Sequence, residues 1–274
     1  MIELPEARTL ARDLNQELQG KTITAVRGDF ESHKFTFYSG TLEAYRAALV
    51  GQTVTDVTVS GFYVQIHAGD YLVAFRDGAN IRYSTPGVPE PKNSKLTLEF
   101  DDGSMITATV SMYAFIGLID TREPIDNPYY QMSLDRIDAL DRAFTFDYFQ
   151  SLITPDTVKL SAKGFLATGQ RIPGIGNGTV QDILWHAQIN PRTKLRDLSP
   201  VQIKQLYDAT VSTLEEMTTQ GGRDTEKNIY GEPGRYQTIL SSIGYKNGCP
   251  ICSSAIKKEN FLGGSIYYCP ICQK

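Results

Sequence analysis

Residues 249–272, CPICSSAIKKENFLGGSIYYCPIC, decide how the C-terminal part folds and hold all four cysteines of the 274-residue chain. The cysteines form two Cys-x-x-Cys pairs 16 residues apart, a spacing with which two pairs of thiolates can close one tetrahedral zinc site. Disulfide bonds are the alternative, but a two-residue gap suits metal ligation better than bridging. We therefore expect one structural zinc ion, bound by Cys249, Cys252, Cys269 and Cys272.

The segment between the two cysteine pairs has the pattern of a β-hairpin. Residues 255–261 form the outgoing strand, Gly263-Gly264 the turn and residues 265–268 the returning strand. A hairpin this short is not stable alone. Zinc binding contributes roughly 10–16 kcal/mol in small modules, so the metal can hold it. The segment is thus predicted to be a zinc ribbon.

The composition is that of an ordinary globular protein, with 41% hydrophobic and 21% charged residues. Residues 2–20 carry six charged side chains and do not resemble a signal peptide. No long apolar run indicates a membrane span. Together with the free thiols, this predicts a cytoplasmic protein without a membrane partner.

The net charge of −4 is unevenly distributed along the chain. Residues 1–154 hold 13 basic and 21 acidic side chains, whereas residues 155–274 hold 14 and 10. If the protein binds nucleic acid, the C-terminal part should supply most of the phosphate contacts. Ordinary variation of surface charge is an equally simple interpretation.

The first residues have the pattern of an amphipathic helix, predicted over residues 3–18 and followed by Gly20. Its apolar face comprises Leu4, Ala7, Ala11, Leu14 and Leu18. Glu3 and Glu6 lie in its first turn, where the helix dipole favours carboxylates. That electrostatic role is the simplest explanation of the two glutamates.

Residues 22–120 change to a period of two, which predicts many short strands in an antiparallel sandwich or barrel. Turn signals such as Asp77-Gly78 separate several of the strands, residues 85–93 read as a loop and residues 121–130 as a linker. The predicted strands cover residues 22–26, 34–38, 54–59, 63–67, 71–75, 95–100 and 104–110.

The remainder is predicted to be mostly helical, with helices over residues 147–153, 156–168, 179–187 and 200–219. Residues 173–178 read PGIGNG, and such a glycine-rich turn before a helix can bind phosphate through free N–H groups. A tight turn without a ligand fits equally well. Residues 220–236 form a long polar loop, of a length that is often functional.

Four motifs in this order resemble the formamidopyrimidine-DNA glycosylase / endonuclease VIII family. The opening residues 3–6, ELPE, resemble the start of that family, and residues 174–177, GIGN, resemble its helix–two-turn–helix element. The glycines at 221–222, 231 and 234 resemble the stretch before its zinc finger. Residues 268–273, YCPICQ, resemble the end of the finger, so the resemblance covers the whole chain.

The resemblance implies an α+β protein that binds damaged or abasic double-stranded DNA as a monomer, in a cleft between two lobes. Residues 1–125 would form the N-terminal helix and antiparallel β-sandwich, residues 126–240 the helix–two-turn–helix domain and residues 241–274 the zinc ribbon finger. The damaged nucleotide is turned out of the duplex. In the family, an N-terminal proline amine attacks the sugar and forms a Schiff base, while a glutamate handles protons.

The chain departs from the family pattern at residues that serve this chemistry. Ile2 stands where the family has proline, and removal of an initiator methionine requires a small second residue, so the Met1 amine would lie one residue out of register. Phe62 occupies the position of an active-site lysine, and Gly264 that of a finger arginine. The family's gap-filling residues have no clear match in residues 75–79 or 113–117.

The candidate catalytic residues are therefore Glu3, Glu6, Met1 and Ile2. Either Glu3 activates a water molecule or the Met1 amine acts from a shifted position. The resemblance also implies DNA contacts at Gly174, Gly176, Asn177 and Lys257. Asn177 would bind phosphate and could also cap the following helix.

We expect a DNA-repair protein of base excision, a DNA glycosylase with altered N-terminal chemistry and with AP-lyase activity of the proline type weak or lost. A non-catalytic relative that binds distorted DNA is one alternative. A zinc-ribbon module that binds protein or RNA is another, which the acidic net charge favours.

Overall fold

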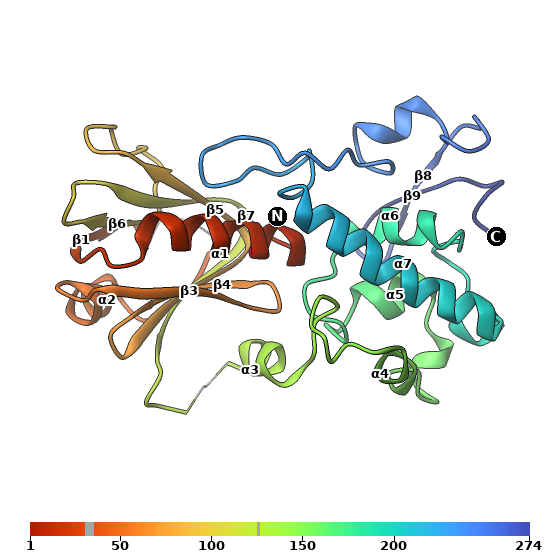
Figure 1. Cartoon of the computed structure of the whole chain (residues 1–274), viewed down its shortest axis with the longest axis horizontal. Helices are drawn as coiled ribbons and strands as arrows, with labels where there is room; N and C mark the ends of the chain where they lie inside the picture. Colours follow the sequence, from red (N-terminus) through yellow and green to blue (C-terminus); the bar gives the residue numbers. More distant parts are fainter. Residues whose placement is uncertain (31–35, 125–126) are drawn as a thin grey trace. The chain divides into compact units, whose positions relative to one another are not determined.

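The computed structural model describes residues 1–30, 36–124 and 127–274, which form two compact units (Figure 1). The β unit comprises Met1–Ile2, Glu6–Gln131 and Glu226–Pro233. The helical unit comprises Glu3–Pro5, Met132–Thr225 and Gly234–Lys274. The first six residues are thus shared between the units. The predicted domain boundaries at residues 125 and 240 stay predictions.

Helix α1 (Leu4–Leu18) matches the helix predicted over residues 3–18 to within one residue. Its apolar face is fully buried, with Ala7, Leu14 and Leu18 each at 0% exposure. These side chains join strand residues such as Ile66 and Phe75 in the main hydrophobic core. The 3.6-residue spacing of the apolar positions therefore explains how α1 packs on the sheet of the β unit.

The described strands of the β unit form a seven-stranded sheet in the order β1-β6-β7-β5-β4-β3, with β2 beside β7. All neighbours are antiparallel except β2, which runs parallel to β7. The predicted α+β class with an antiparallel sheet is confirmed. The strands are β1 (Ile23–Gly28), β2 (Thr36–Ser39), β3 (Val54–Ser60), β4 (Tyr63–Ala68), β5 (Tyr71–Ser84), β6 (Leu96–Phe100) and β7 (Met105–Asp120).

Strand β5 is much longer than predicted, because Asp77-Gly78 does not end it, and its partner β7 also continues past the predicted end at residue 110. Asp77 adopts a left-handed conformation with φ 56°, and the β5–β7 register shifts between Asp77 and Ala79. At Gly78 an added Cβ would lie 2.9 Å from the Tyr113 carbonyl oxygen. One β5 residue, Gly78, thus stands opposite residues 111–113 of β7, which form a β-bulge, and β5 continues past the predicted turn, which was wrong.

Helix α2 (Leu42–Leu49) was not predicted, although Thr41 caps it by accepting a hydrogen bond from the backbone N–H of Ala44. Residues 85–93 form a loop, as predicted. The predicted linker was partly wrong, because helix α3 (Pro128–Asp135) begins inside it. Residues 34–35 of one predicted strand and 125–126 of the linker lie outside the described residues.

The helical unit follows the predicted pattern with one break. Helix α7 (Pro200–Thr219) has the predicted bounds and begins with a capping box between Ser199 and Gln202. The helix predicted over residues 156–168 is divided, because Ser161 caps a new helix at Ala162. The other helices are α4 (Phe146–Ser151), η1 (Thr157–Lys159), α5 (Ala162–Ala167), α6 (Thr179–His186), η2 (Leu195–Asp197) and η3 (Gly244–Asn247).

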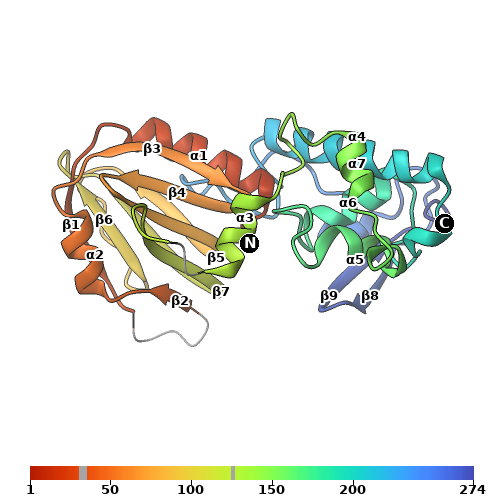
Figure 2. The same cartoon turned by 90° about the horizontal axis from the view of Figure 1, so that it is seen from below.

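The C-terminal hairpin is formed by β8 (Lys257–Phe261) and β9 (Gly264–Tyr268), close to the predicted bounds (Figure 2). Its turn contains Leu262 at φ 50° and Gly263 at φ 75°. Along the described part of the chain, no helix combines the length and apolar character that crossing a membrane requires.

Candidate functional site

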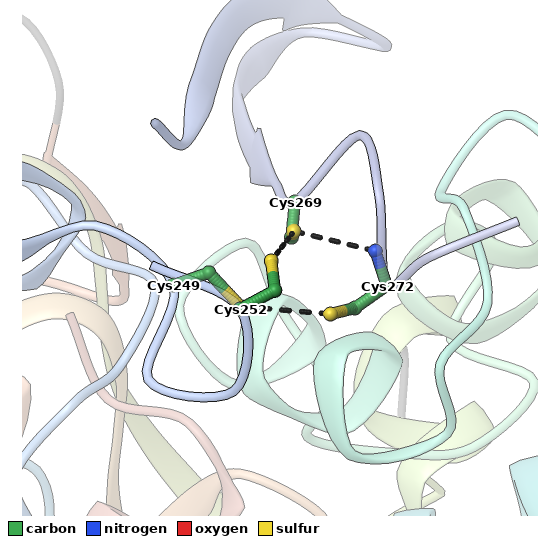
Figure 3. A group of neighbouring side chains, drawn as sticks. All are labelled: Cys249, Cys252, Cys269 and Cys272. Atoms are coloured by element: carbon green, nitrogen blue, oxygen red, sulfur yellow. Dashed lines mark hydrogen bonds between the residues drawn. The ribbon is translucent and has the colours of Figure 1, made fainter. Parts of the chain in front are cut away.

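The four cysteines converge at the base of the hairpin (Figure 3), and their sulfur atoms all lie within 4.8 Å of one another. The sulfurs of Cys252 and Cys269 are 3.5 Å apart, and those of Cys249 and Cys272 are 3.8 Å apart. Zinc–sulfur bonds of about 2.3 Å in a tetrahedron place neighbouring sulfurs about 3.8 Å apart. The cluster therefore has the dimensions of a tetrahedral metal site.

Hydrogen bonds around the cluster favour the thiolate form of its most buried member. Burial alone would raise the pKa of Cys269, but hydrogen bonds from the Ser254 hydroxyl and from the backbone N–H of Cys272 lower the pKa to about 6. The thiolate is the form that binds metal. Four sulfur donors are also the ligands that a soft cation such as zinc prefers.

Two glutamine side chains attach the hairpin to helix α6 and the residues that follow it. Gln181 accepts a hydrogen bond from Tyr267 N–H at 3.0 Å and donates to the carbonyl oxygens of Ser265 and Asn177 at 2.9 Å. Gln273 donates to the Ile189 carbonyl oxygen at 3.0 Å and accepts from Cys269 N–H at 2.8 Å. Sequence reasoning missed Gln181, since a mid-helix glutamine carries no signal of its partners.

Glu3 lies at the N-terminus of α6, where its carboxylate accepts three backbone hydrogen bonds. Gly178 N–H donates to Oε1 at 2.8 Å, while Thr179 N–H and Gly176 N–H donate to Oε2 at 2.8 and 3.2 Å. Helix N-termini leave such N–H groups unpaired and carry a partial positive charge. Glu3, 173 residues earlier than Gly176 in the sequence, therefore caps the helix.

A buried cation completes the surroundings of this carboxylate. The Arg223 Nη1 atom lies 3.7 Å from Glu3 Oε1, and the two side chains are only 3% and 5% exposed. Burial alone would raise the pKa of Glu3, but Arg223, the Thr179 hydroxyl and the backbone N–H groups of Gly178 and Thr179 lower it below the ordinary value. Glu3 is therefore an ionised carboxylate at neutral pH.

The glycines of the PGIGNG turn make room for residues 3 and 4. Gly174 has φ +82°, and an added Cβ would lie 2.7 Å from the Leu4 Cβ. At Gly176 an added Cβ would lie 2.6 Å from Glu3 Oε1. The N–H groups that we expected to receive a phosphate are thus used by Glu3. The DNA contacts predicted for Gly174 and Gly176 stay predictions.

Asn177 is exposed at the tip of the turn and does not cap α6 through its side chain. That expected capping role is wrong, because Glu3 already receives the N–H groups of Gly178 and Thr179. The Asn177 amide lies against the hairpin, where a Cβ added to Gly264 would be 2.8 Å from its Cγ. Lys257 is exposed at the start of β8 and pairs across the hairpin with Tyr268.

Met1, Ile2 and Glu6 come together in the β unit, where they line a small cavity of about 20 Å³ with Arg82 and Glu226. The Met1 amino group forms an ion pair with Glu226. Ile2 is 5% exposed, and its backbone N–H donates to the Asp77 carbonyl oxygen at 2.7 Å. Residue 2 is thus a core residue that pairs with Asp77 of β5.

Phe62 is buried in an aromatic cluster. The Arg76 guanidinium lies over the rings of Phe62 and Tyr63, at 5.7 and 5.2 Å from their centroids, and over Phe115 and Tyr129 at 5.7 and 5.4 Å. Such contacts stabilise a cation at each ring face. The β unit therefore does hold a cation beside Phe62, supplied by the neighbouring strand β5.

Comparisons with known proteins agree with this architecture. The family model "Formamidopyrimidine-DNA glycosylase N-terminal domain" matches residues 1–110. A formamidopyrimidine-DNA glycosylase of Lactobacillus delbrueckii subsp. bulgaricus is 30% identical over 283 residues, and one of Lactococcus lactis subsp. cremoris is 27% identical over 281 residues. Both alignments cover 100% of each protein, so the likeness is not confined to one motif.

Solved structures share the fold over the whole length. The complex of Lactococcus lactis Fpg with DNA containing an abasic site superimposes with a TM-score of 0.84 at 24% identity, covering 99% of both chains. The complex of the wild-type Lactococcus lactis protein with DNA containing an oxidised pyrimidine gives the same TM-score of 0.84 at 24% identity, with the same coverage. The full-length sequence match at 30% identity makes this chain a member of the formamidopyrimidine-DNA glycosylase family.

Proposed function

We propose that this chain is a DNA glycosylase of base-excision repair that acts on damaged or abasic duplex DNA, with Glu3 as its central catalytic group. The named relatives are formamidopyrimidine-DNA glycosylases, and solved relatives hold DNA with an abasic site. The observation that carries the proposal is Glu3 itself. A carboxylate buried to 4% exposure, with a lowered pKa and three N–H donors, is an expensive arrangement for a purely structural residue.

An ionised carboxylate suits the charge changes of base removal. Cleavage of a glycosidic bond passes through an oxocarbenium-like state, in which positive charge develops on the sugar. A fixed negative charge stabilises that state, and it can orient an attacking water. The target nucleotide has to leave the base stack before either can occur. Because its pKa is lowered, Glu3 acts as a carboxylate and not as a proton donor.

Attack by residue 2 is not part of this proposal. The nitrogen of Ile2 is an amide that donates a hydrogen bond to Asp77, and amide nitrogens are poor nucleophiles. The Met1 amino group forms an ion pair with Glu226, and an amine attacks carbon only when its electron pair is free. Glu6 lines the same cavity as Met1 and Ile2.

The helical unit supplies the DNA contacts in this proposal. Asn177 is exposed beside the hairpin, and its amide can donate to a phosphate oxygen. Lys257 adds a positive charge on the same hairpin. Gly174 and Gly176 contribute by shaping the turn that presents Asn177. The net charge of +4 over residues 155–274 supports phosphate binding by this part of the chain.

Zinc is the ion that we propose for the four cysteines, in a structural role. The sulfur separations fit zinc–thiolate bonds, and a closed set of four thiolates leaves no position for a substrate. The reduced thiols also fit the proposed cytoplasmic location.

Residues 1–125, 126–240 and 241–274 are the proposed functional domains.

The test combines a base-release assay with borohydride trapping on duplexes that carry an oxidised base or an abasic site. We expect base release without a trapped covalent adduct. Glu3→Gln should abolish release, while Glu43→Gln, a surface carboxylate whose side chain is 77% exposed, should leave it unchanged. A trapped adduct would show that an amine still attacks the sugar and would overturn the assignment to Glu3.

A salt titration separates the remaining outcomes. DNA binding without base release would mean a non-catalytic, structure-specific binder. Affinity for duplex DNA should fall with salt on a log–log slope of about 0.9 per phosphate neutralised. Absence of binding to intact and abasic duplexes at low salt would leave the zinc-ribbon module that binds protein or RNA.

A further inference from the structure

Arg223 is an arginine in a loop, yet it is 2% exposed. Arginine is almost never buried to this degree unless it has a partner. Its position is set by the backbone around it. Gly221 at φ +77° and Gly222 at φ +94° end helix α7 in conformations that suit glycine. Arg223 then pairs as an isolated β-bridge with Tyr236, the last residue of the 220–236 loop.

A further glycine keeps this loop tight. A Cβ added to Gly234 would lie 2.1 Å from the Gly222 carbonyl oxygen and 2.6 Å from that of Arg223. The two arms of the loop thus contact backbone to backbone. Asp224, the residue after Arg223, is itself held in place, because its carboxylate accepts hydrogen bonds from the N–H and hydroxyl of Thr238 at 3.3 and 2.8 Å. These contacts therefore hold in place the backbone that carries the Arg223 side chain.

The guanidinium lies against the first turn of α6. A Cβ added to Gly178 would be only 1.4 Å from Arg223 Nη1, so the glycine leaves room for the cation. Gly178 N–H donates to Glu3 Oε1, the same oxygen that faces Arg223 at 3.7 Å. Arg223 and the helix N-terminus thus approach one carboxylate oxygen together.

We propose that Arg223 is a positioning residue for base removal, which holds Glu3 as an oriented carboxylate at the N-terminus of α6. The inference rests on the proposed function. Transfer of a carboxylate into the protein interior is costly unless a cation and hydrogen-bond donors compensate it. Here the Arg223 guanidinium is that cation, and the N–H groups of Gly176, Gly178 and Thr179 are the donors. Arg223 ties the charge and the orientation of Glu3 to the 220–236 loop.

A role through Glu3 differs from a purely structural role in what it changes. The groups that face Glu3 include the Arg223 guanidinium, the Thr179 hydroxyl and the N–H groups of Gly176, Gly178 and Thr179. Removal of the guanidinium takes away the positive charge among them. The single-turnover rate should then fall while DNA affinity stays, because Arg223 is buried away from solvent. A misplacement of about 1 Å can cost about a hundredfold in rate.

The experiment measures single-turnover base release against pH, with DNA affinity measured separately, for wild type, Arg223→Met, Arg223→Lys and Arg235→Met. Arg235 is an exposed arginine of the same loop and controls for the loss of one charge. We expect Arg223→Met to lose about tenfold to a hundredfold in rate, with an unchanged Kd for DNA. The acid limb of its pH–rate profile, where the rate falls as Glu3 is protonated, should lie at higher pH than in wild type. Arg223→Lys should recover part of the rate and return the acid limb toward that of wild type.

Each outcome decides one proposal. A single-turnover rate of Arg223→Met within twofold of that of wild type at all pH values would overturn the role of Arg223 and leave the proposed glycosylase activity standing. Equal losses of rate and affinity in Arg223→Met and Arg223→Lys would also overturn it, since misfolding would then explain both. Gly178→Ala displaces the guanidinium without removing it and should give the same shift of the acid limb. Wild-type protein that releases no base would instead refute the proposed glycosylase activity.

Discussion

The metal cluster and the Glu3 site both belong to the helical unit, but they are built in opposite ways. The cysteines lie within 24 consecutive residues on one hairpin, and their partners are near in sequence. The Glu3 site joins residue 3 to the turn at 176–179 and to Arg223. The first site can form whenever the ion is present, whereas the second exists only after the helical unit has folded. Variants of each should therefore fail differently.

The largest effect is expected from loss of the metal. Chelation, or Cys269→Ser, should unfold residues 249–274, because zinc contributes roughly 10–16 kcal/mol in small modules. Hydrogen exchange of the β8–β9 amides should rise while that of the β unit stays unchanged. Ser253→Ala, an exposed change in the same segment, is the control. Full protection of the hairpin after complete metal removal would contradict a structural metal, and DNA binding should weaken with the hairpin.

The next largest effect is expected from Glu3→Gln, which should lower the free energy of unfolding by about 3 kcal/mol, because it removes the negative charge that faces a buried cation. Unfolding can be followed through Trp185, the single tryptophan, which is 9% exposed in the helical unit. Unlike metal loss, this change should lower the stability of the whole helical unit in one transition. Glu43→Gln is the matched surface control. A normal Trp185 transition in Glu3→Gln would contradict the role of the ion pair.

The same variant predicts the pH dependence of stability. The pKa of Glu3 is lower in the folded state than its ordinary value of 4.5, so the folded state binds its proton less readily than the unfolded state. The stabilisation is therefore present above about pH 4.5 and is lost as the pH falls through the lower, folded pKa. Wild type should lose stability in this acid range more steeply than Glu3→Gln. Parallel acid curves would contradict the lowered pKa.

Gly178→Ala should cost about 1–3 kcal/mol, because its methyl group would occupy the space of the Arg223 guanidinium. Gly221→Ala tests backbone strain instead, since an added Cβ there meets none of the described atoms within 4 Å but φ is +77°. We expect about 1 kcal/mol from that strain. Thermal unfolding of the two variants, again read from Trp185, separates crowding of the ion pair from strain. Equal costs would mean that Arg223 moves aside freely.

The smallest effect concerns the hairpin turn. Gly264→Arg would place a cation beside Asn177, whose flexible side chain can move to make room. We expect tighter DNA binding and a salt slope that increases by about 0.9 for one additional phosphate contact. Asn260→Arg adds the same charge on the exposed face of the same hairpin and should increase the slope less. Equal slopes in both variants would show that position 264 has no special access to phosphate.

Sequence patterns predicted what depends on neighbouring residues. The cysteine spacing, the hairpin and the bounds of α7 follow from short-range signals, such as the Ser199 cap. Asp77-Gly78 was misread as a turn, because the dipeptide lies within β5 opposite a bulge of β7, and both long strands continue past it. The capping of α6 by Glu3 and the burial of Arg223 depend on contacts between residues far apart in the chain, for which one sequence carries no signal.

Gln181 links the stability of the metal-binding hairpin to the start of helix α6. Its amide joins the Asn177 carbonyl oxygen, one residue before the glycine whose N–H donates to Glu3, to two backbone groups of β9. An ion that binds the folded cysteines adds a free energy of RT ln(1 + [M]/Kd) to that strand. Metal binding at the cysteines therefore favours the folded hairpin to which Gln181 attaches the start of α6.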